Sequence, residues 1–174
     1  MEGLRQRLAK GEQSAFAELY DLFASRLYRY LTVRLSSAHD AADVMQEVFV
    51  RLARSRKQFA MREGDLAGYI FAIAHNEAAR LLGKRAQQDR VAAAHANVIE
   101  RVSHADRTME LTDSVRFALA SISDEQREVV TMKIYGALTF SEIAEAIGLP
   151  QGTVASRYRA ALVQMRELLA RNEK

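Results

Sequence analysis

The feature that most constrains the fold of this chain is a pair of short helices predicted over residues 139–159. Thr139-Phe-Ser-Glu142 fits a capping box, in which the Thr hydroxyl and the Glu carboxylate satisfy free amides at a helix start. Gly148 can adopt the left-handed conformation that closes a helix, and Pro150 follows at the corner. The sequence therefore predicts a helix-turn-helix in this segment.

The second helix of this pair has the side chains that a DNA-reading helix needs. In a helix-turn-helix the second helix can enter the major groove and offer its first residues to base edges. An ordinary helical hairpin shares the same turn chemistry, so it stays as the alternative to DNA binding. The candidate contact residues are small or hydrogen-bonding, with arginine behind them: Gln151, Gly152, Thr153, Ala155, Ser156, Arg157 and Arg159. The apolar face of the same helix is predicted to contain Val154, Tyr158, Ala161, Leu162 and Met165.

Composition and periodicity predict an all-α protein of two small helical domains joined by a linker. The chain has 174 residues, one proline and few β-branched alternations, and its 49% hydrophobic content is enough to build cores. Residues 86–110 are rich in alanine and polar side chains and have weak periodicity, so a linker is expected there. We predict domains at 1–87 and 111–174, with the linker at 88–110.

Several function classes are excluded or disfavoured by what the sequence lacks. Without cysteine there can be no disulfide or thiolate zinc site, and a reducing cytoplasm is the expected location. No run approaches the roughly 18 apolar residues of a membrane span, so membrane insertion is not expected. No glycine-rich phosphate loop, nucleophile elbow or His-Glu-x-x-His pair is present, so we expect neither an enzyme nor a bound cofactor. His95 and His104 have no acidic or cysteine partner at metal spacing, so no metal is expected.

The N-terminal half is predicted to be a series of helices. A short helix over residues 2–10 precedes a long one from Ser14, and further helices are expected at 38–56 and 66–85, with a loop at 57–64 between them. The long helix has an apolar stripe that most simply forms a core, although a platform for stacking single-stranded bases is the alternative. That stripe consists of Phe16, Leu19, Tyr20, Phe23, Leu27 and Leu31.

Two of these helices have charge patterns with more than one interpretation. The helix at 38–56 has acids early and bases late, which suits the helix dipole of a solvated helix but also a docking surface for a protein. The helix at 66–85 gathers cations on one face, which either contact phosphates or only solvate the helix end. The formal charge of +3 and pI of about 9.3 permit nucleic-acid binding without requiring it.

Two separated blocks of the sequence resemble one protein family in the right order. Residues 40–52 (DAADVMQEVFVRL) and 69–82 (YIFAIAHNEAARLL) resemble the second domain of extracytoplasmic-function sigma factors. Residues 122–130, 139–145 and 152–157 resemble their fourth domain. The acidic Asp-x-x-Gln-Glu-x-Phe block upstream of a helix-turn-helix is the strongly specific part of this resemblance.

The resemblance implies a role for each block. The first block would dock on the clamp helices of the RNA polymerase β′ subunit through Asp40, Asp43, Gln46, Glu47, Phe49 and Arg51. The following segment would capture a base flipped from the −10 element and hold the surrounding backbone, through Phe59, Met61, Arg62, Asn76, Arg80, Lys84 and Arg85. The fourth domain would lie at the β flap and bind the −35 element through the residues of its recognition helix together with Arg127 and Thr139. Core RNA polymerase, promoter DNA and an anti-sigma factor are the implied partners.

Some positions depart from the family pattern. Ala155 stands where Lys or Arg is frequent, Pro150 where a serine N-cap is common, and His75 where an arginine usually precedes Asn76. The usual tryptophan near Leu52 is also absent. These departures concern the promoter sequence that is read more than the function itself.

Two other function classes remain as alternatives. A stand-alone helix-turn-helix regulator would bind duplex DNA as a symmetric dimer, but it leaves the acidic block at 40–52 unexplained. A protein-only module that mimics a sigma factor and sequesters an anti-sigma factor is the second. The leading prediction is a promoter-specificity subunit of bacterial RNA polymerase.

Overall fold

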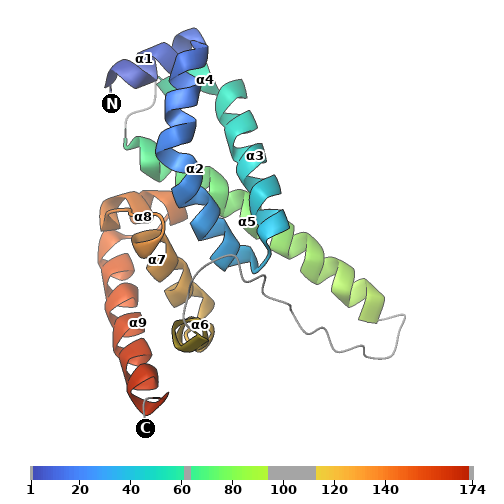
Figure 1. The fold of residues 1–174 in the computed structure, drawn as a ribbon, viewed down its shortest axis with the longest axis vertical. Coiled ribbons are helices and arrows are strands. Elements are labelled where there is room, and N and C mark those ends of the chain that lie inside the picture. Colours follow the sequence, from blue (N-terminus) through green and yellow to red (C-terminus); the bar gives the residue numbers. More distant parts are fainter. Residues whose placement is uncertain (1, 61–63, 94–112, 173–174) are drawn as a thin grey trace. The chain divides into compact units, whose positions relative to one another are not determined.

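The computed structural model describes residues 2–60, 64–93 and 113–172, and all the regular elements in these residues are helices (Figure 1). They group into two compact units, one of residues 1–62 and 73–106 and the other of residues 63–72 and 107–174. The all-α prediction is therefore confirmed. The helices are α1 (Glu2–Lys10), α2 (Gln13–Leu35), α3 (Ala38–Arg54), α4 (Arg56–Ala60), α5 (Leu66–Ala93), α6 (Asp113–Ala120), α7 (Asp124–Ile134), α8 (Phe140–Ile147) and α9 (Gln151–Asn172).

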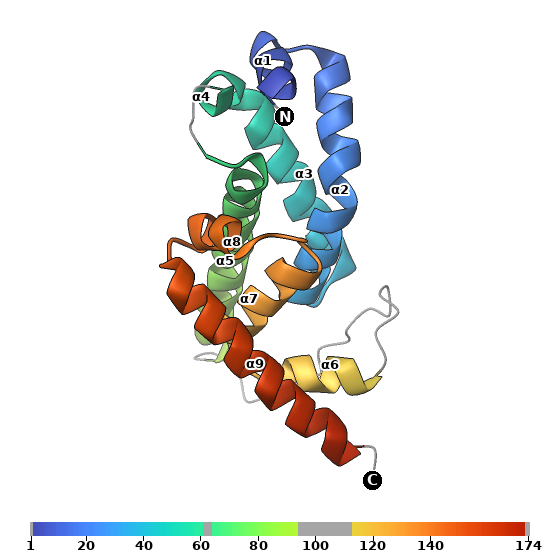
Figure 2. The same ribbon diagram turned by 90° about the vertical axis from the view of Figure 1, so that its left-hand side faces the viewer.

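The centre of the first unit is a hairpin of α2 and α3, which lie side by side in Figures 1 and 2. Ser36 reverses the chain with a φ of 53°, and the Ser37 hydroxyl accepts a hydrogen bond from the Asp40 amide at 3.3 Å to start α3. Four residues of the predicted apolar stripe of α2 are buried, Leu19, Phe23, Leu27 and Leu31, whereas Phe16 is half-buried and Tyr20 is 48% exposed. Tyr20 follows a fully buried Leu19 and so points about 100° away from it, where its ring contacts Phe49 at 4.9 Å between ring centroids.

The segment predicted as a loop at 57–64 is partly helical, which corrects that prediction. Helix α4 covers Arg56–Ala60 and packs against α1, whose Leu4 and Leu8 are buried. A five-residue helix is too short to show a periodic apolar pattern, so packing against another helix rather than local sequence stabilises it. Gly11 takes a φ of 79° beside the Arg56 guanidinium. Residues 61–63 lie outside the described residues.

Helix α5 begins as predicted and ends later than predicted. The Asp65 carboxylate accepts a hydrogen bond from the Ala67 amide at 2.7 Å and so caps the start of the helix. The helix was expected to end near Arg85 but continues to Ala93, because the alanine- and glutamine-rich residues that follow have high helix propensity. The beginning of the predicted linker is thus helical, and residues 94–112, with His95 and His104, lie outside the described residues.

In the second unit, α9 packs against each of α6, α7 and α8. The predicted capping box of Thr139 with Glu142 is present at the start of α8, and Ser123 with Gln126 forms a second one at the start of α7. Gly148 ends α8 with a φ of 67°, also as predicted. The predicted apolar face of α9 is wrong in one residue, because Leu162 is 41% exposed while its neighbour Ala161 is fully buried.

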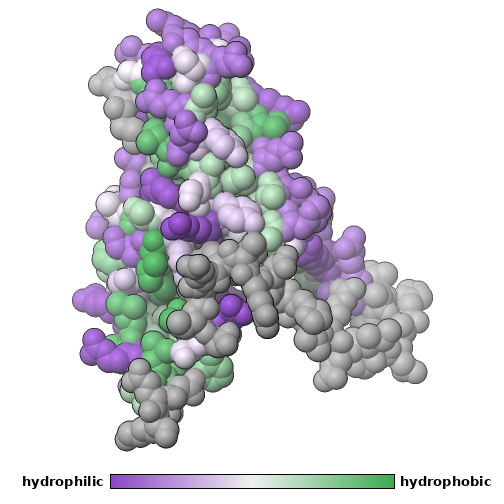
Figure 3. Space-filling view, in the orientation of Figure 1, coloured by the Kyte–Doolittle hydropathy of each residue, from purple (hydrophilic) through white to green (hydrophobic). Residues whose placement is uncertain are grey.

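Apolar side chains are also exposed on this second unit, and hydrophobic residues reach the surface over α9 in Figure 3. The largest exposed ones are Phe117, Ile134, Leu162 and Val163. No helix in the described part of the chain is long and apolar enough to span a membrane.

Candidate nucleic-acid and polymerase interfaces

The first turns of α9 present most of the predicted DNA-contact residues to the outside. The Pro150 carbonyl accepts from the amides of Thr153 and Val154, at 2.9 and 3.1 Å, so the helix starts directly after the proline. Val154 is fully buried and anchors this end of α9 in the unit. Because one side of the helix is fixed in the core, the opposite side is free to enter a groove. The side chains of Gln151, Ser156 and Arg159 are exposed, as is Gly152, whereas Thr153, Ala155 and Arg157 are half-buried.

The hydrogen bonds of the exposed residues in α9 are local ones. The Ser156 hydroxyl donates to the Thr153 carbonyl at 2.9 Å, and Nε of Arg159 donates to the Ala155 carbonyl at 3.3 Å. The Arg159 contact occupies one of the five N–H donors of the guanidinium and does not neutralise its charge, because the acceptor is an uncharged carbonyl. Arg159 therefore combines an exposed cation with unused donors on the face that is predicted to read DNA.

Arg127 occupies a different kind of position from the other predicted −35 residues. Its guanidinium donates to the backbone carbonyls of Leu119, Ala120 and Ile122 at 2.7, 3.2 and 3.0 Å, and to the Asp124 carboxylate at 2.8 Å. Three of its hydrogen bonds thus cap the end of α6 and the turn that follows it, and the fourth joins it to the first residue of α7. The sequence offered no signal for this cap, and a DNA contact by Arg127 stays a prediction.

Thr139, the remaining predicted −35 residue, is exposed at the start of α8. Its hydroxyl accepts from the Glu142 amide at 3.2 Å, and its own amide donates to Oε2 of Glu142 at 2.5 Å. The capping box therefore uses the Thr139 hydroxyl as an acceptor, which leaves its O–H group able to donate to a phosphate.

Helix α3 exposes part of the predicted polymerase-binding block on one side. Asp43 and Gln46 are exposed and Glu47 is half-buried, and their spacing places them on one face of the helix. His39 lies 3.4 Å from Asp43. Phe49 is half-buried against Tyr20. These residues form an acidic surface beside an aromatic pair.

Asp40 is not part of that exposed surface. It is 8% exposed, and its Oδ1 accepts a hydrogen bond from Nη2 of Arg85 on α5 at 2.5 Å. Burial raises the pKa of the Asp40 carboxyl, but the hydrogen bonds from Arg85 and Ser37 outweigh it, so the pKa lies below its ordinary value. The pair joins a residue predicted to bind polymerase to one predicted to bind DNA.

Helix α5 exposes the other predicted backbone-binding residues. Asn76, Arg80 and Lys84 are exposed, and they recur every four residues along one side of the helix. Of the predicted base-capturing residues, Phe59 lies in α4 with its side chain outside the described set, and Met61 and Arg62 lie outside the described residues.

Glu77 is the residue of this region that sequence reasoning missed. Its side chain is only 3% exposed, and its Oε1 lies 2.8 Å from Nη2 of Arg51 while its Oε2 accepts from Nη2 of Arg80 at 2.7 Å. Glu77 shares the apolar face of its helix with Ile70, Ala74 and Leu81. An acid on such a face was itself a signal, because a buried carboxylate needs cationic partners.

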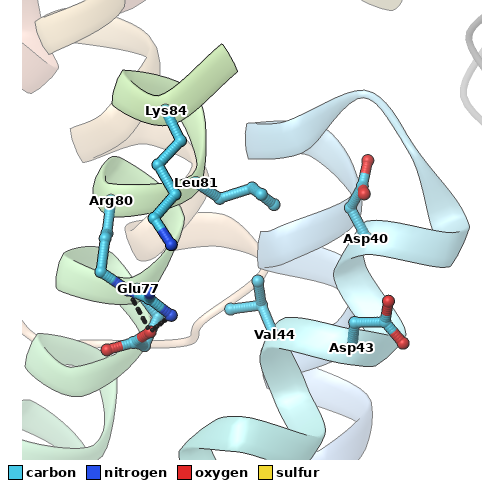
Figure 4. Close-up of a pocket in the computed structure, with 7 residues that line it drawn as sticks. All are labelled: Asp40, Asp43, Val44, Glu77, Arg80, Leu81 and Lys84. Atoms are coloured by element: carbon cyan, nitrogen blue, oxygen red, sulfur yellow. Dashed lines mark hydrogen bonds and ion pairs between the residues drawn. The ribbon is translucent and has the colours of Figure 1, made fainter. Parts of the chain in front are cut away.

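A pocket of about 180 Å³ lies between α3 and α5 (Figure 4). Asp40, Asp43 and Val44 line it from α3, and Lys84 and Arg80 from α5. Figure 4 shows Leu81 reaching toward α3 above Val44, while Arg80 folds back onto Glu77. Among the described residues there is no cluster of three or more side chains suited to hold a metal ion.

Comparison with known proteins assigns both halves of the chain. Residues 19–88 match Sigma-70 region 2, and residues 118–167 match Sigma-70 region 4. ECF RNA polymerase sigma factor SigK of Mycobacterium tuberculosis strain H37Rv is 26% identical over 174 residues, covering 97% of this chain and 93% of its own. SigK of Mycobacterium ulcerans is also 26% identical, over 175 residues, with the same coverage.

Solved structures show the same fold. The sigma factor RpoE of Bartonella quintana, solved with the anti-sigma factor NepR, has a TM-score of 0.72 at 22% identity and covers 89% of this chain and 96% of its own. CnrH, solved with the cytosolic domain of CnrY, has a TM-score of 0.69 at 22% identity and covers 97% and 96%. With region 2 providing the acidic and basic helices and region 4 the helix-turn-helix, this chain belongs to the extracytoplasmic-function sigma factors, which bind core RNA polymerase, recognise promoters and promote transcription initiation.

Proposed function

We propose that the exposed side of α9 reads the −35 element in the major groove, with Gln151, Ser156 and Arg159 at the base edges. The observation that carries this proposal is the exposure of these three side chains in the first turns of a recognition helix whose Val154 is buried in the unit. In vitro transcription with core polymerase on promoters randomised at the −35 element tests it. A Gln151→Ala variant should lose its sequence preference at one or two base positions of the −35 element. An unchanged sequence preference would show that Gln151 does not contact the bases.

The acidic surface of α3 is the proposed contact with the clamp helices of the polymerase β′ subunit. Asp43, Gln46 and Glu47 share one accessible face, as a docking helix requires. Charge reversal by Asp43→Lys with Glu47→Lys should abolish copurification with core polymerase. Glu125→Lys, at an exposed position of α7, is the matched control and should leave it intact. Equal binding by both variants would place the docking surface elsewhere.

The basic side of α5 is the proposed holder of the −10 element backbone. Asn76, Arg80 and Lys84 are exposed on one side of this helix, where a strand of phosphates could run along it. The proposed base-capturing segment is residues 57–64, with Phe59, Met61 and Arg62, by resemblance. Permanganate footprinting of the opened strands tests this assignment, and Lys84→Ala should reduce opening without changing core binding.

The remaining proposals concern context. The protein acts in the cytoplasm, where polymerase and promoter DNA are found, and it has no catalytic activity of its own; polymerase performs the chemistry. An anti-sigma factor is its proposed regulator, because the Bartonella relative is found with NepR. The protein purified from cells in which its promoters are silent should transcribe in vitro only after such a partner is removed. Equal activity before and after removal would argue against it.

A further inference from the structure

Glu77 is an ion-pair centre whose two oxygens hold arginines from two helices. Oε1 lies 2.8 Å from Nη2 of Arg51 on α3, and Oε2 accepts from both Nη2 and Nε of Arg80, at 2.7 and 3.0 Å. The carboxylate is 3% exposed, whereas the Arg80 side chain is 53% exposed. A carboxylate so buried is stable only with its cations in place, so its position and theirs are fixed together.

The way in which Glu77 binds Arg80 leaves a defined part of that guanidinium available. Arg80 uses Nε and Nη2 toward Oε2, which leaves the Nη1 donors for another acceptor. Figure 4 shows the Arg80 side chain folded back along α5 onto Glu77 rather than extended into solvent. An arginine held on one edge loses less rotamer freedom when its other edge binds a phosphate, so the contact is stronger than that of a freely moving side chain.

Arg51 is a second cation at Glu77, so Glu77 can bind Arg80 and still leave it available to another acceptor. Because Arg51 compensates Oε1, the carboxylate does not depend on Arg80 alone. Arg51 in turn has Nε 3.2 Å from Oε1 of Glu47 on its own helix. Glu47, Arg51, Glu77 and Arg80 therefore form a continuous chain of charges from the α3 surface to α5.

We infer that Glu77 is a positioning residue for promoter opening: it presents the free edge of the Arg80 guanidinium to a phosphate of the promoter backbone. This inference rests on the proposed role of Arg80 at the −10 element. It assigns to Glu77 no contact of its own with DNA. A purely structural bridge between α3 and α5 is the competing role, and the experiment separates the two.

The experiment is a double-mutant cycle on the full chain bound to core polymerase. Glu77→Gln, Arg80→Ala and the double variant are compared in open-complex affinity over a range of salt concentrations, after normalising for core binding measured without DNA. Arg80→Ala should weaken the open complex about tenfold and lower the salt slope by about one. Glu77→Gln should weaken it about threefold or more when Arg80 is present and have no further effect when Arg80 is absent.

Each other result overturns the inference in its own way. An equal loss from Glu77→Gln in both backgrounds would mean a structural bridge, no loss would mean no positioning, and tighter binding would mean that Glu77 withholds Arg80. No effect of Arg80→Ala would instead remove the proposed role of Arg80, and the inference with it, while leaving the other proposed contacts in place.

Two further variants keep the test interpretable. Glu18→Gln removes a carboxylate from another arginine pair of the same unit, 2.8 Å from Arg7, and should leave open-complex affinity unchanged. If Glu77→Gln melts below the assay temperature, Glu77→Asp replaces it, because it keeps the charge for Arg51 but draws the carboxylate back by one methylene. Its loss should again depend on Arg80, and a loss independent of Arg80 would contradict the inference.

Discussion

The two units use charge differently. In the first unit, residues assigned to polymerase or DNA bind each other, since Asp40 pairs with Arg85 and Glu77 with both Arg51 and Arg80. In the second unit, capping boxes and buried apolar residues hold the helices, and exposed Arg159 bonds a backbone carbonyl of its own helix. Folding and recognition should therefore be separable by mutation at Arg159 of the second unit and entangled in the first. Arg127 and Thr139 are exceptions in the second unit, because both hold helix ends.

The largest expected effect tests whether the second unit depends on its apolar core. Ile143 is fully buried in α8, so Ile143→Ala should lower the free energy of unfolding of that unit by about 2–5 kcal/mol. Hydrogen exchange of the α8 and α9 amides measures this loss. The exposed Glu145→Ala of the same helix is the control and should change little. Unaltered exchange in Ile143→Ala would mean that other contacts hold the unit.

The next largest expected effect is a loss of DNA binding without a change in the stability of the protein. Arg159→Ala removes an exposed cation from the proposed groove face, so −35 binding should weaken by about 1–3 kcal/mol while the thermal midpoint stays the same. Promoter binding by the polymerase complex and a melting curve are measured on the same preparation. Unchanged promoter binding and transcription would show that Arg159 faces solvent in the complex.

In the first unit, by contrast, a functional charge should affect stability. Asp40→Asn removes the partner of half-exposed Arg85, and the free energy of unfolding should fall by about 1–2 kcal/mol at neutral pH. Because the folded state lowers the pKa of Asp40, its contribution is complete above the ordinary aspartate pKa and is lost as the pH falls through the folded value.

Urea denaturation of wild type and Asp40→Asn at a series of pH values checks this dependence. The difference between the two proteins should be full at pH 7 and shrink in strong acid. A difference that is constant with pH would assign the loss to packing, and no difference at pH 7 would break the contrast between the units.

The smallest expected effect on stability concerns the N-cap of α8. Thr139→Ala deletes the acceptor for the Glu142 amide and should cost the second unit about 1 kcal/mol. Ser141→Ala, which removes an exposed hydroxyl from the same turn, is the matched control and should cost little. Chemical denaturation of both variants gives the comparison, and equal losses would show that the capping box contributes nothing specific.

The parts of the fold that were predictable depend on residues close together in the sequence. The two capping boxes, the helix end at Gly148 and the Asp65 cap each depend on residues that lie within about four positions of one another in the sequence. The structure contains all of these features. Periodicity likewise predicted the apolar stripe of α2, although it could not place Tyr20 at the edge of the buried sector. Helix α4 was not predicted, because its stability depends on packing against α1, which is distant in the sequence.

The charges at the candidate site show the opposite case. Asp40 and Arg85 are 45 residues apart, and Glu77 meets Arg51 across two helices, so no local pattern could pair them. Helical periodicity therefore predicts on which face of a helix a charged residue lies. It does not predict which charged residues form ion pairs with each other. Arg127 is a similar case, since its backbone acceptors have no sequence signature.

The central position of α9 has a consequence for how the protein is made. Because α9 packs against α6, α7 and α8, and contributes Val154, Ala161 and Met165 to the buried interior, that interior is incomplete until about residue 165 has left the ribosome. The helices of the first unit are synthesised earlier and can already meet. A nascent chain can therefore bring together the helices of its first unit before the interior of its second unit is complete.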